Sequence, residues 1–163
     1  MARVKLDQET FGLSSIMERI TRARVKYCFK DDDTIYFIVG IGELGKAIGK
    51  GGVNIKRVQQ EFGKKIKIIE FRNDPVSFAR NLIYPLKVEE IVLQGEEVLI
   101  KDNSKKIKGQ IIGRDRSNLV FINKVMKRFF NVEVKVVWEG KLLCFRGYKK
   151  AFQNLYKTPS ILE

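Results

Sequence analysis

The sequence predicts an α+β protein built from two copies of one small domain. Helical and strand periodicities follow each other in the same order twice, over residues 1–70 and 74–138. Each copy also contains a glycine-containing turn between two helical segments, followed by an alternating β-branched segment. We therefore expect the element order helix, strand, strand, helix, helix, strand in each copy, with a three-stranded sheet covered by helices on one face.

The first copy is expected to open with a helix over about residues 8–22. An alternating apolar segment at 25–29 and a segment at 34–39, apolar on both faces, flank an acidic turn, which indicates a hairpin with one well-buried strand. An amphipathic helix then precedes a strand at 66–69. Its apolar residues, spaced by three and four, are Ile55, Val58 and Phe62.

The second copy opens with Asp74 and Pro75, a helix N-cap followed by proline at the first helical position. Strands are expected at about 88–93 and 97–102, with a turn at Gly95 and Glu96. The amphipathic helix before the last strand, at 134–137, has four apolar residues on one face: Leu119, Ile122, Met126 and Phe129.

The two copies can be overlaid at their glycine turns. Residues 45–55 align with 109–119, and a glycine, an isoleucine, a second glycine, a basic residue and an asparagine coincide. We expect domains at 1–71 and 72–138, joined without a Gly/Ser spacer and held at a fixed angle. In the extension at 139–163 we expect a strand at 141–146 and aromatic residues at helical spacing. These residues either pack back on the second domain or contact a ligand.

Composition indicates a polyanionic partner and argues against most enzymes. The 163 residues carry 32 Lys and Arg against 19 Asp and Glu, a formal net charge of +13. Because the sequence contains no histidine, it has no Ser-His or Cys-His nucleophile and no His metal ligand. The two cysteines form no CxxC pair, so we expect ordinary thiols. No catalytic residue, metal or cofactor is expected.

Hydropathy predicts a cytoplasmic protein that does not enter membranes. No window approaches the ~18 consecutive apolar residues of a membrane span, and residues 1–12 lack the apolar core of a secretory signal. We expect a monomer.

Three overlapping glycine patterns compete in the first copy. Residues 40–45 fit GxGxxG, and 40–46 fit the start of a P-loop, so a nucleotide-binding enzyme is the alternative of a different functional class. Both patterns fail on context. Ala47 stands where a P-loop has Ser or Thr, and further glycines interrupt the helix that should follow. The third pattern, GxxG at 49–52, uses all of these glycines.

A GxxG turn between two helices has the chemistry of a phosphodiester site. Without Cβ atoms the backbone can approach the phosphate, and N–H groups at the start of the next helix point toward its oxygens. Lys50 adds mobile positive charge, although a solvated loop lysine is the alternative role. Further basic residues surround it: Lys46, Lys56 and Arg57.

With these motifs, residues 7–138 resemble tandem K-homology (KH) domains of type II, and segments 47–55 and 112–119 resemble those of the archaeal NusA family of transcription factors. The resemblance implies single-stranded RNA binding and a role in transcription elongation, termination or antitermination. RNA polymerase or its complex is then a candidate partner. A KH protein of ribosome assembly or of the small ribosomal subunit is the alternative within the same chemistry. KH domains hold about four nucleotides beside an apolar groove, here expected at Leu44, Ala47, Ile48 and Ile55.

The second turn departs from the pattern, because Asp115 and Arg116 replace its glycines. We expect RNA contacts there through Arg114 and Arg116, with Asp115 pairing with one of them or accepting from a base edge. Asn54 and Asn118 either contact RNA or stabilise the start of the following helix. The complete predicted RNA-binding set is Lys46, Ile48, Gly49, Lys50, Gly51, Gly52, Asn54, Lys56, Arg57, Gly113, Arg114, Asp115, Arg116 and Asn118.

Overall fold

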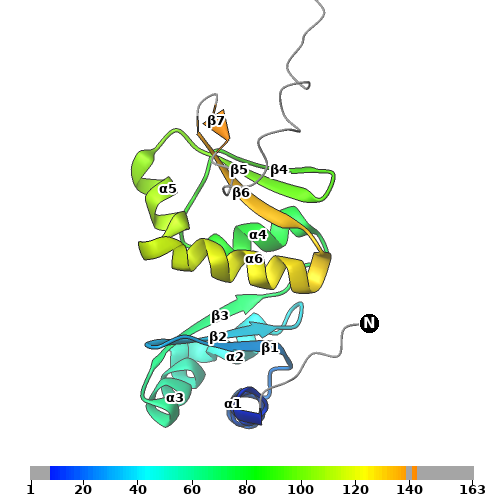
Figure 1. The fold of residues 1–163 in the computed structure, drawn as a ribbon. Coiled ribbons are helices and arrows are strands. Elements are labelled where there is room, and N and C mark those ends of the chain that lie inside the picture. The colour runs from blue at the N-terminus through cyan, green and yellow to red at the C-terminus, as the bar shows by residue number, and fades with distance from the viewer. Residues whose placement is uncertain (1–7, 139–140, 143–163) are drawn as a thin grey trace, which may run out of the picture. The chain divides into compact units, whose positions relative to one another are not determined.

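In the computed structural model the chain divides by its internal contacts into two compact units. Figure 1 shows the helices and strands of both units. Unit 1 comprises residues 1–85 and unit 2 residues 86–163. The structure describes residues 8–138 and 141–142. No helix in these ranges has the length and apolarity needed to cross a lipid bilayer.

Unit 1 contains a three-stranded sheet in the order β1-β2-β3. Strands β1 and β2 form the expected antiparallel hairpin, and β3 pairs parallel with β2, so that Phe37 lies opposite both Cys28 and Ile68. The elements are α1 (Gln8–Thr21), β1 (Val25–Lys30), β2 (Thr34–Val39), α2 (Leu44–Ile48), the 3-10 turn η1 (Lys50–Gly52), α3 (Val53–Phe62), β3 (Lys65–Glu70) and α4 (Pro75–Ile83).

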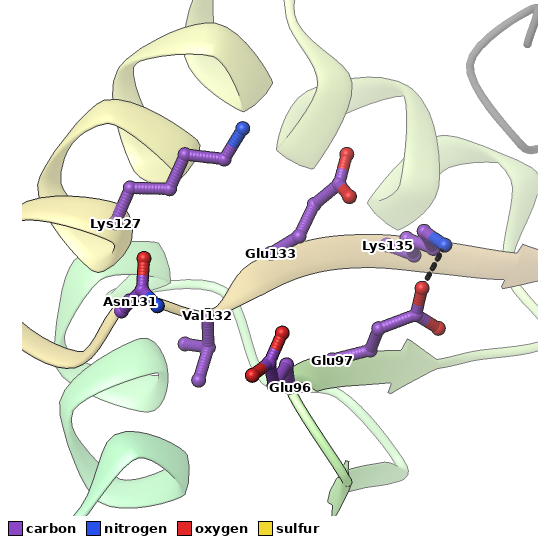
Figure 2. Close-up of a pocket in the computed structure, with 7 residues that line it drawn as sticks. All are labelled: Glu96, Glu97, Lys127, Asn131, Val132, Glu133 and Lys135. Atoms are coloured by element: carbon purple, nitrogen blue, oxygen red, sulfur yellow. Dashed lines mark hydrogen bonds and ion pairs between the residues drawn. The ribbon is translucent and has the colours of Figure 1, made fainter.

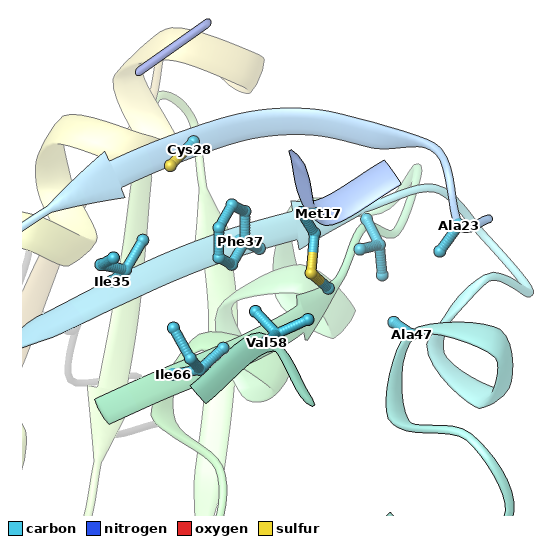
Figure 3. Packing of buried hydrophobic residues seen from close by; sticks show 9 residues of the cluster. Met17, Ala23, Cys28, Ile35, Phe37, Ala47, Val58 and Ile66 are labelled. Carbon is cyan, nitrogen blue, oxygen red and sulfur yellow. The ribbon is translucent and has the colours of Figure 1, made fainter. Parts of the chain in front are cut away.

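The core of unit 1 lies between one face of this sheet and the helices α1, α2 and α3 (Figure 3). Cys28 is a free thiol in this core, and burial raises its pKa to about 12, which keeps it protonated and unreactive. The other cysteine, Cys144, lies outside the described residues. The buried cluster consists of Met17, Ala23, Cys28, Ile35, Phe37, Val39, Ala47, Val58 and Ile66.

Helix α4 packs against β3 and therefore belongs to unit 1 by its contacts. The rings of Phe71 and Phe78 meet edge to face at 5.2 Å, and Asn81 Nδ2 donates to the carbonyl of Glu70 at 2.9 Å. Lys67 Nζ donates to the carbonyl of Leu82, and burial of this amine lowers its pKa. The sequence places this helix at the start of the second copy, whereas the contacts divide the chain after Pro85.

Unit 2 repeats the hairpin, the glycine turn and the parallel strand, and its sheet order is β4-β5-β6-β7. Strand β7 adds a fourth, antiparallel strand at the start of the segment 141–146. The rest of that segment and the aromatic residues of 143–163 lie outside the described residues. The elements are β4 (Glu90–Gln94), β5 (Glu97–Lys101), α5 (Lys105–Ile112), η2 (Arg114–Arg116), α6 (Ser117–Phe130), β6 (Glu133–Trp138) and β7 (Lys141–Leu142).

The α+β class and the repeated order of elements are thus confirmed. The predicted N-cap is also observed, since Asp74 Oδ2 accepts from the N–H of Ser77 at 2.8 Å, which lowers the pKa of this carboxyl. Two details differ from expectation. The sheet of unit 2 gains β7, and α4 provides unit 1 with a helix against β3 beyond the expected three.

Candidate nucleic-acid interface

The first glycine turn, residues 49–52, connects α2 to α3 and will be called turn 1. Helix α2 ends where the N–H of Gly49 donates to the carbonyl of Gly45 at 2.9 Å. The chain then reverses through three residues with positive φ: Gly49 at 75°, Gly51 at 64° and Gly52 at 76°. Lys50 and Gly51 are exposed at the tip. Turn 1 is a tight, outward-facing corner, which agrees with the predicted helix-GxxG-helix arrangement.

The second turn, residues 113–116, will be called turn 2 and has the same backbone. Gly113 has a φ of 75°, Asp115 of 51° and Arg116 of 64°. The hydrogen bond from Arg116 N to the carbonyl of Gly113, 3.2 Å long, matches the 3.1 Å bond from Gly52 N to Gly49 O. Two residues with side chains therefore adopt the left-handed conformation that glycine adopts in turn 1, at a cost of about 1 kcal/mol each.

One asparagine side chain holds each turn in place. Asn54 Nδ2 donates to the carbonyl of Lys46 at 2.7 Å, and Asn118 Nδ2 donates to the carbonyl of Gln110 at 2.9 Å. Each bond ties the last turn of one helix to the first turn of the next and satisfies a carbonyl left without an intrahelical partner. Of the two roles considered for these asparagines, the structure shows the stabilising one.

The first glycine of each turn makes room for this asparagine. A Cβ on Gly49 would lie 2.8 Å from Cγ of Asn54, and a Cβ on Gly113 would lie 2.7 Å from Cγ of Asn118. A Cβ on Gly51, by contrast, would meet nothing within 4 Å. The first glycine is thus required by the fold, whereas the tip of the turn is open toward solvent.

Basic residues surround turn 1, but not all of them are free. Lys46 Nζ forms a 3.0 Å ion pair with Glu43, and hydrogen bonds from Lys46 and from the N–H of Arg24 lower the pKa of the Glu43 carboxyl. Lys50, Lys56 and Arg57 are exposed. The positive charge of turn 1 therefore comes mainly from these three side chains.

The four apolar side chains predicted beside turn 1 differ in exposure, and Leu44 is half-buried. Ala47 is fully buried, and Ile55 packs against the core, so these two are structural. Ile48 is 36% exposed and can meet a ligand. Val53, which directly follows the last glycine and is 46% exposed, was not among the residues predicted to contact RNA. The sequence feature that could have identified Val53 is an apolar residue at the first position of α3, outside the apolar face formed by Ile55, Val58 and Phe62.

Unit 2 differs at the matching positions of the repeat. Lys108, in the place of Leu44, is 1% exposed, and Val120, in the place of Lys56, is 54% exposed. Ile112, in the place of Ile48, is half-buried. The surroundings of turn 2 are thus less basic along α6 than those of turn 1 along α3.

All predicted residues lie at one turn or the other. Nine of them, from Lys46 to Arg57, surround turn 1 in unit 1, and five, from Gly113 to Asn118, form turn 2 and the start of α6. Each group is brought together locally by its own helix-turn-helix.

The alternative glycine pattern at residues 40–46 lacks the geometry of a phosphate loop. The N–H of Gly42, which a phosphate loop would direct at its ligand, donates to Glu70 Oε1 at 2.7 Å. A carboxylate at this position repels a phosphate. The helix that follows, α2, has only five residues, so the long helix of a dinucleotide or P-loop site is absent.

Unit 2 contains a groove that is lined by side chains of both charges (Figure 2). It has a volume of about 310 Å³ and is lined mainly by Glu96, Glu97, Glu133, Lys127 and Lys135. Lys135 is paired with Glu97. Within the described ranges no group of three acidic, Cys or His side chains is placed to hold a metal ion. This groove does not resemble a site for a polyanion.

Comparison with known proteins agrees with these features. A KH-domain family model matches residues 34–107, a range that includes turn 1. The chain is 34% identical to the probable transcription termination protein NusA of Methanocaldococcus jannaschii over 146 residues, which cover 86% of this chain and 79% of the relative. The chain belongs to the archaeal NusA family.

Two further relatives extend this result. The NusA relative from Methanococcus vannielii is 33% identical and covers 99% of this chain and 91% of its own length. The crystal structure of APE1850 superposes with a TM-score of 0.61 at 31% identity, covering 80% of this chain and 97% of that one. The resemblance inferred from the glycine turns is therefore confirmed.

Proposed function

We propose that this NusA-family protein binds single-stranded RNA through its two turns and acts on transcription. The observation that carries the proposal is the open tip of turn 1, where Gly51 presents bare backbone and Lys50 is exposed beside it. The repetition of the same backbone in turn 2 supports a second point of contact on the same RNA. The protein binds and does not catalyse.

In turn 1 the backbone holds the phosphate. Gly51 and Gly52 have no Cβ to keep the phosphate away, and the N–H groups at the start of α3 face it. Lys50, Lys56 and Arg57 supply charge, and Gly49 and Asn54 keep the corner rigid. Ile48 and Val53 provide an apolar surface on which unstacked bases can lie.

In turn 2 the side chains replace the backbone as the main contact. Arg116 carries a long side chain where Gly52 has none, so the chain cannot approach the phosphate as closely. Arg114 and Arg116 reach the phosphate with forked guanidinium groups instead. Asp115 lies at the tip, where it accepts from a base edge or pairs with an arginine.

The role in transcription rests on the names of the relatives, which describe probable transcription termination proteins. We propose that this protein acts as a monomer in the cytoplasm, on nascent RNA, and that RNA polymerase or its complex is its protein partner. In vivo crosslinking distinguishes this role from one in ribosome assembly, because transcripts of many genes, not ribosomal RNA alone, should be recovered.

The decisive experiment is the pair Gly51→Asp with Gly52→Asp in the full chain. Two carboxylates at the tip should repel the phosphate and reduce the affinity for an RNA selected from a random pool by at least about ten-fold. The matched control is Gly63→Asp with Gly95→Asp. Both of these glycines have a positive φ and open space around the missing Cβ, as Gly51 does.

Both variants carry the same charge and a similar backbone strain, so they should show similar thermal transitions. Loss of RNA binding by the turn 1 variant alone supports the proposal. Equal affinity in the two variants, or no RNA recovered with the original chain, contradicts it.

A further inference from the structure

A groove of about 780 Å³ lies in unit 1 between the C-terminal end of α1 and the helix α3. One wall is formed by residues 19–22, which comprise the end of α1 and the residue after it, and the other by residues of α3 from Asn54 to Glu61. At 1.5 Å per residue, the α3 wall is about 10 Å long. Since Asn54 also holds turn 1 in place, the groove begins where turn 1 ends.

The charged residues of this groove are mostly arginines. Arg19 lies in the last turn of α1, Arg22 directly follows this helix, and Arg57 lies in α3, whereas Glu61 is the one acidic residue of the lining. Within residues 8–138 none of the three guanidinium groups forms a hydrogen bond or an ion pair, unlike Lys46, which has Glu43 as a partner. Unpaired like charges along one groove repel each other, and a bound anion relieves this repulsion.

The α1 wall is rigid before any ligand binds. The buried hydroxyl of Thr21 donates to the carbonyl of Met17 at 2.8 Å and accepts from the N–H of Ala23 at 3.1 Å. Arg22 N donates to the carbonyl of Glu18 at 2.7 Å, and Arg22 itself has a left-handed φ of 57°. This fixed reversal of the chain holds two arginines at the rim, so less conformational entropy is lost when they bind.

We propose that this groove binds the sugar-phosphate backbone of the nucleotides next to those held by turn 1. The inference rests on the proposed function, because it extends the same RNA. Guanidinium groups suit phosphate, since their forked N–H donors match its oxygens. In the described part of unit 2, the position that matches Arg57 in the repeat is occupied by the buried Phe121, so this arginine has no counterpart there. The RNA path is therefore longer on unit 1.

The test compares two RNA lengths on the full chain. Mixed-sequence RNAs of about four nucleotides fill one KH site, whereas RNAs of about twelve also reach the groove. The variant is Arg19→Gln with Arg22→Gln. Its control is Arg80→Gln with Lys105→Gln, which removes the same charge from exposed residues outside the groove and both turns. Arg19→Gln alone, within the regular helix α1, serves as a second variant that leaves the left-handed Arg22 unchanged.

We expect the double variant to bind the longer RNA about ten-fold more weakly than the control does, and its salt slope to fall by about 1.4, the value for two phosphates on a single strand. Affinity for the short RNA should change less than two-fold. Equal affinities of variant and control for the longer RNA would overturn the inference, as would an equal loss at both lengths. Failure of the original chain to bind either RNA would instead overturn the proposed function.

Discussion

Turn 1 and turn 2 share a backbone but differ in sequence at three of four positions. Gly49 and Gly113 have the same φ of 75°, and the following tips reverse through the same left-handed conformations. In turn 1 the remaining residues are Lys-Gly-Gly, and in turn 2 they are Arg-Asp-Arg. The comparison separates two requirements. The first glycine and the asparagine five residues later determine the shape, and the positions between them determine what the turn can bind.

The largest loss of stability is expected from substituting the first glycine, which the two turns share. Gly49→Ala and Gly113→Ala place a Cβ within 2.8 Å of an asparagine side chain at a positive φ. We expect each to reduce the free energy of unfolding by about 3 kcal/mol, from steric overlap and backbone strain together. Gly51→Ala, which has the strain but open space around its Cβ, is the control and should cost about 1 kcal/mol. Urea denaturation measures these values.

Removing the asparagine side chain should reduce the free energy of unfolding less than placing a Cβ against it does. Asn54→Ala and Asn118→Ala each lose one hydrogen bond between helices, and we expect a loss of about 1.5 kcal/mol in each unit. Asn73→Ala, an exposed asparagine outside both turns, should change stability by less than about 0.5 kcal/mol. A larger loss in only one unit would show that the two turns are not held in the same way.

A double mutant tests whether the glycine and the asparagine act as a pair. In the background of Asn54→Ala the overlap with the asparagine side chain is removed, and the 3.0 Å approach to the backbone N of position 54 and the positive φ remain, so the added cost of Gly49→Ala should fall to about 2 kcal/mol. Additive losses would mean that the short distance between Gly49 and Asn54 relaxes without energetic consequence.

Much of this organisation could be predicted from the sequence because it is local. The spacing of glycine, basic residue and asparagine lies within one helix-turn-helix, and the cap at Asp74 involves a residue only three positions away. The segment 34–39, apolar on both faces, predicted the buried strand β2, and its burial pattern confirms this prediction. Hydrophobic periodicity and turn formation both depend on residues that are close together in the sequence, so the sequence alone is enough to predict them.

What the sequence did not show depends on contacts between distant segments. The packing of α4 on β3 is decided by the partners of Phe78, which the helix period alone does not specify. Arg19 and Arg22 are ordinary residues at the end of a helix until α3 is placed beside them. The ion pair between Lys46 and Glu43 likewise forms only in the geometry at the start of α2.

A smaller effect is expected from making turn 2 resemble turn 1. Asp115→Gly with Arg116→Gly relieves two left-handed residues that have side chains. Because glycine also raises the entropy of the unfolded chain, the net gain should be about 1 kcal/mol in the free energy of unfolding. A loss of stability would mean that Arg116 contributes a folded-state interaction that exceeds its backbone strain.

The smallest effect should separate the two modes of RNA contact. Lys50 and Arg114 occupy matching positions of the repeat, and both are exposed. In turn 1 the bare backbone remains when Lys50→Ala removes the amine, so we expect about three-fold weaker RNA binding and a salt slope lower by about 0.7, one phosphate contact. In turn 2 no such backbone contact remains, so Arg114→Ala should weaken binding more than Lys50→Ala does. Filter-binding titrations at several salt concentrations measure both values. The reverse order of the two losses would show that the bare glycine tip contributes less than the side chain beside it, and that the two turns hold RNA in one way rather than two.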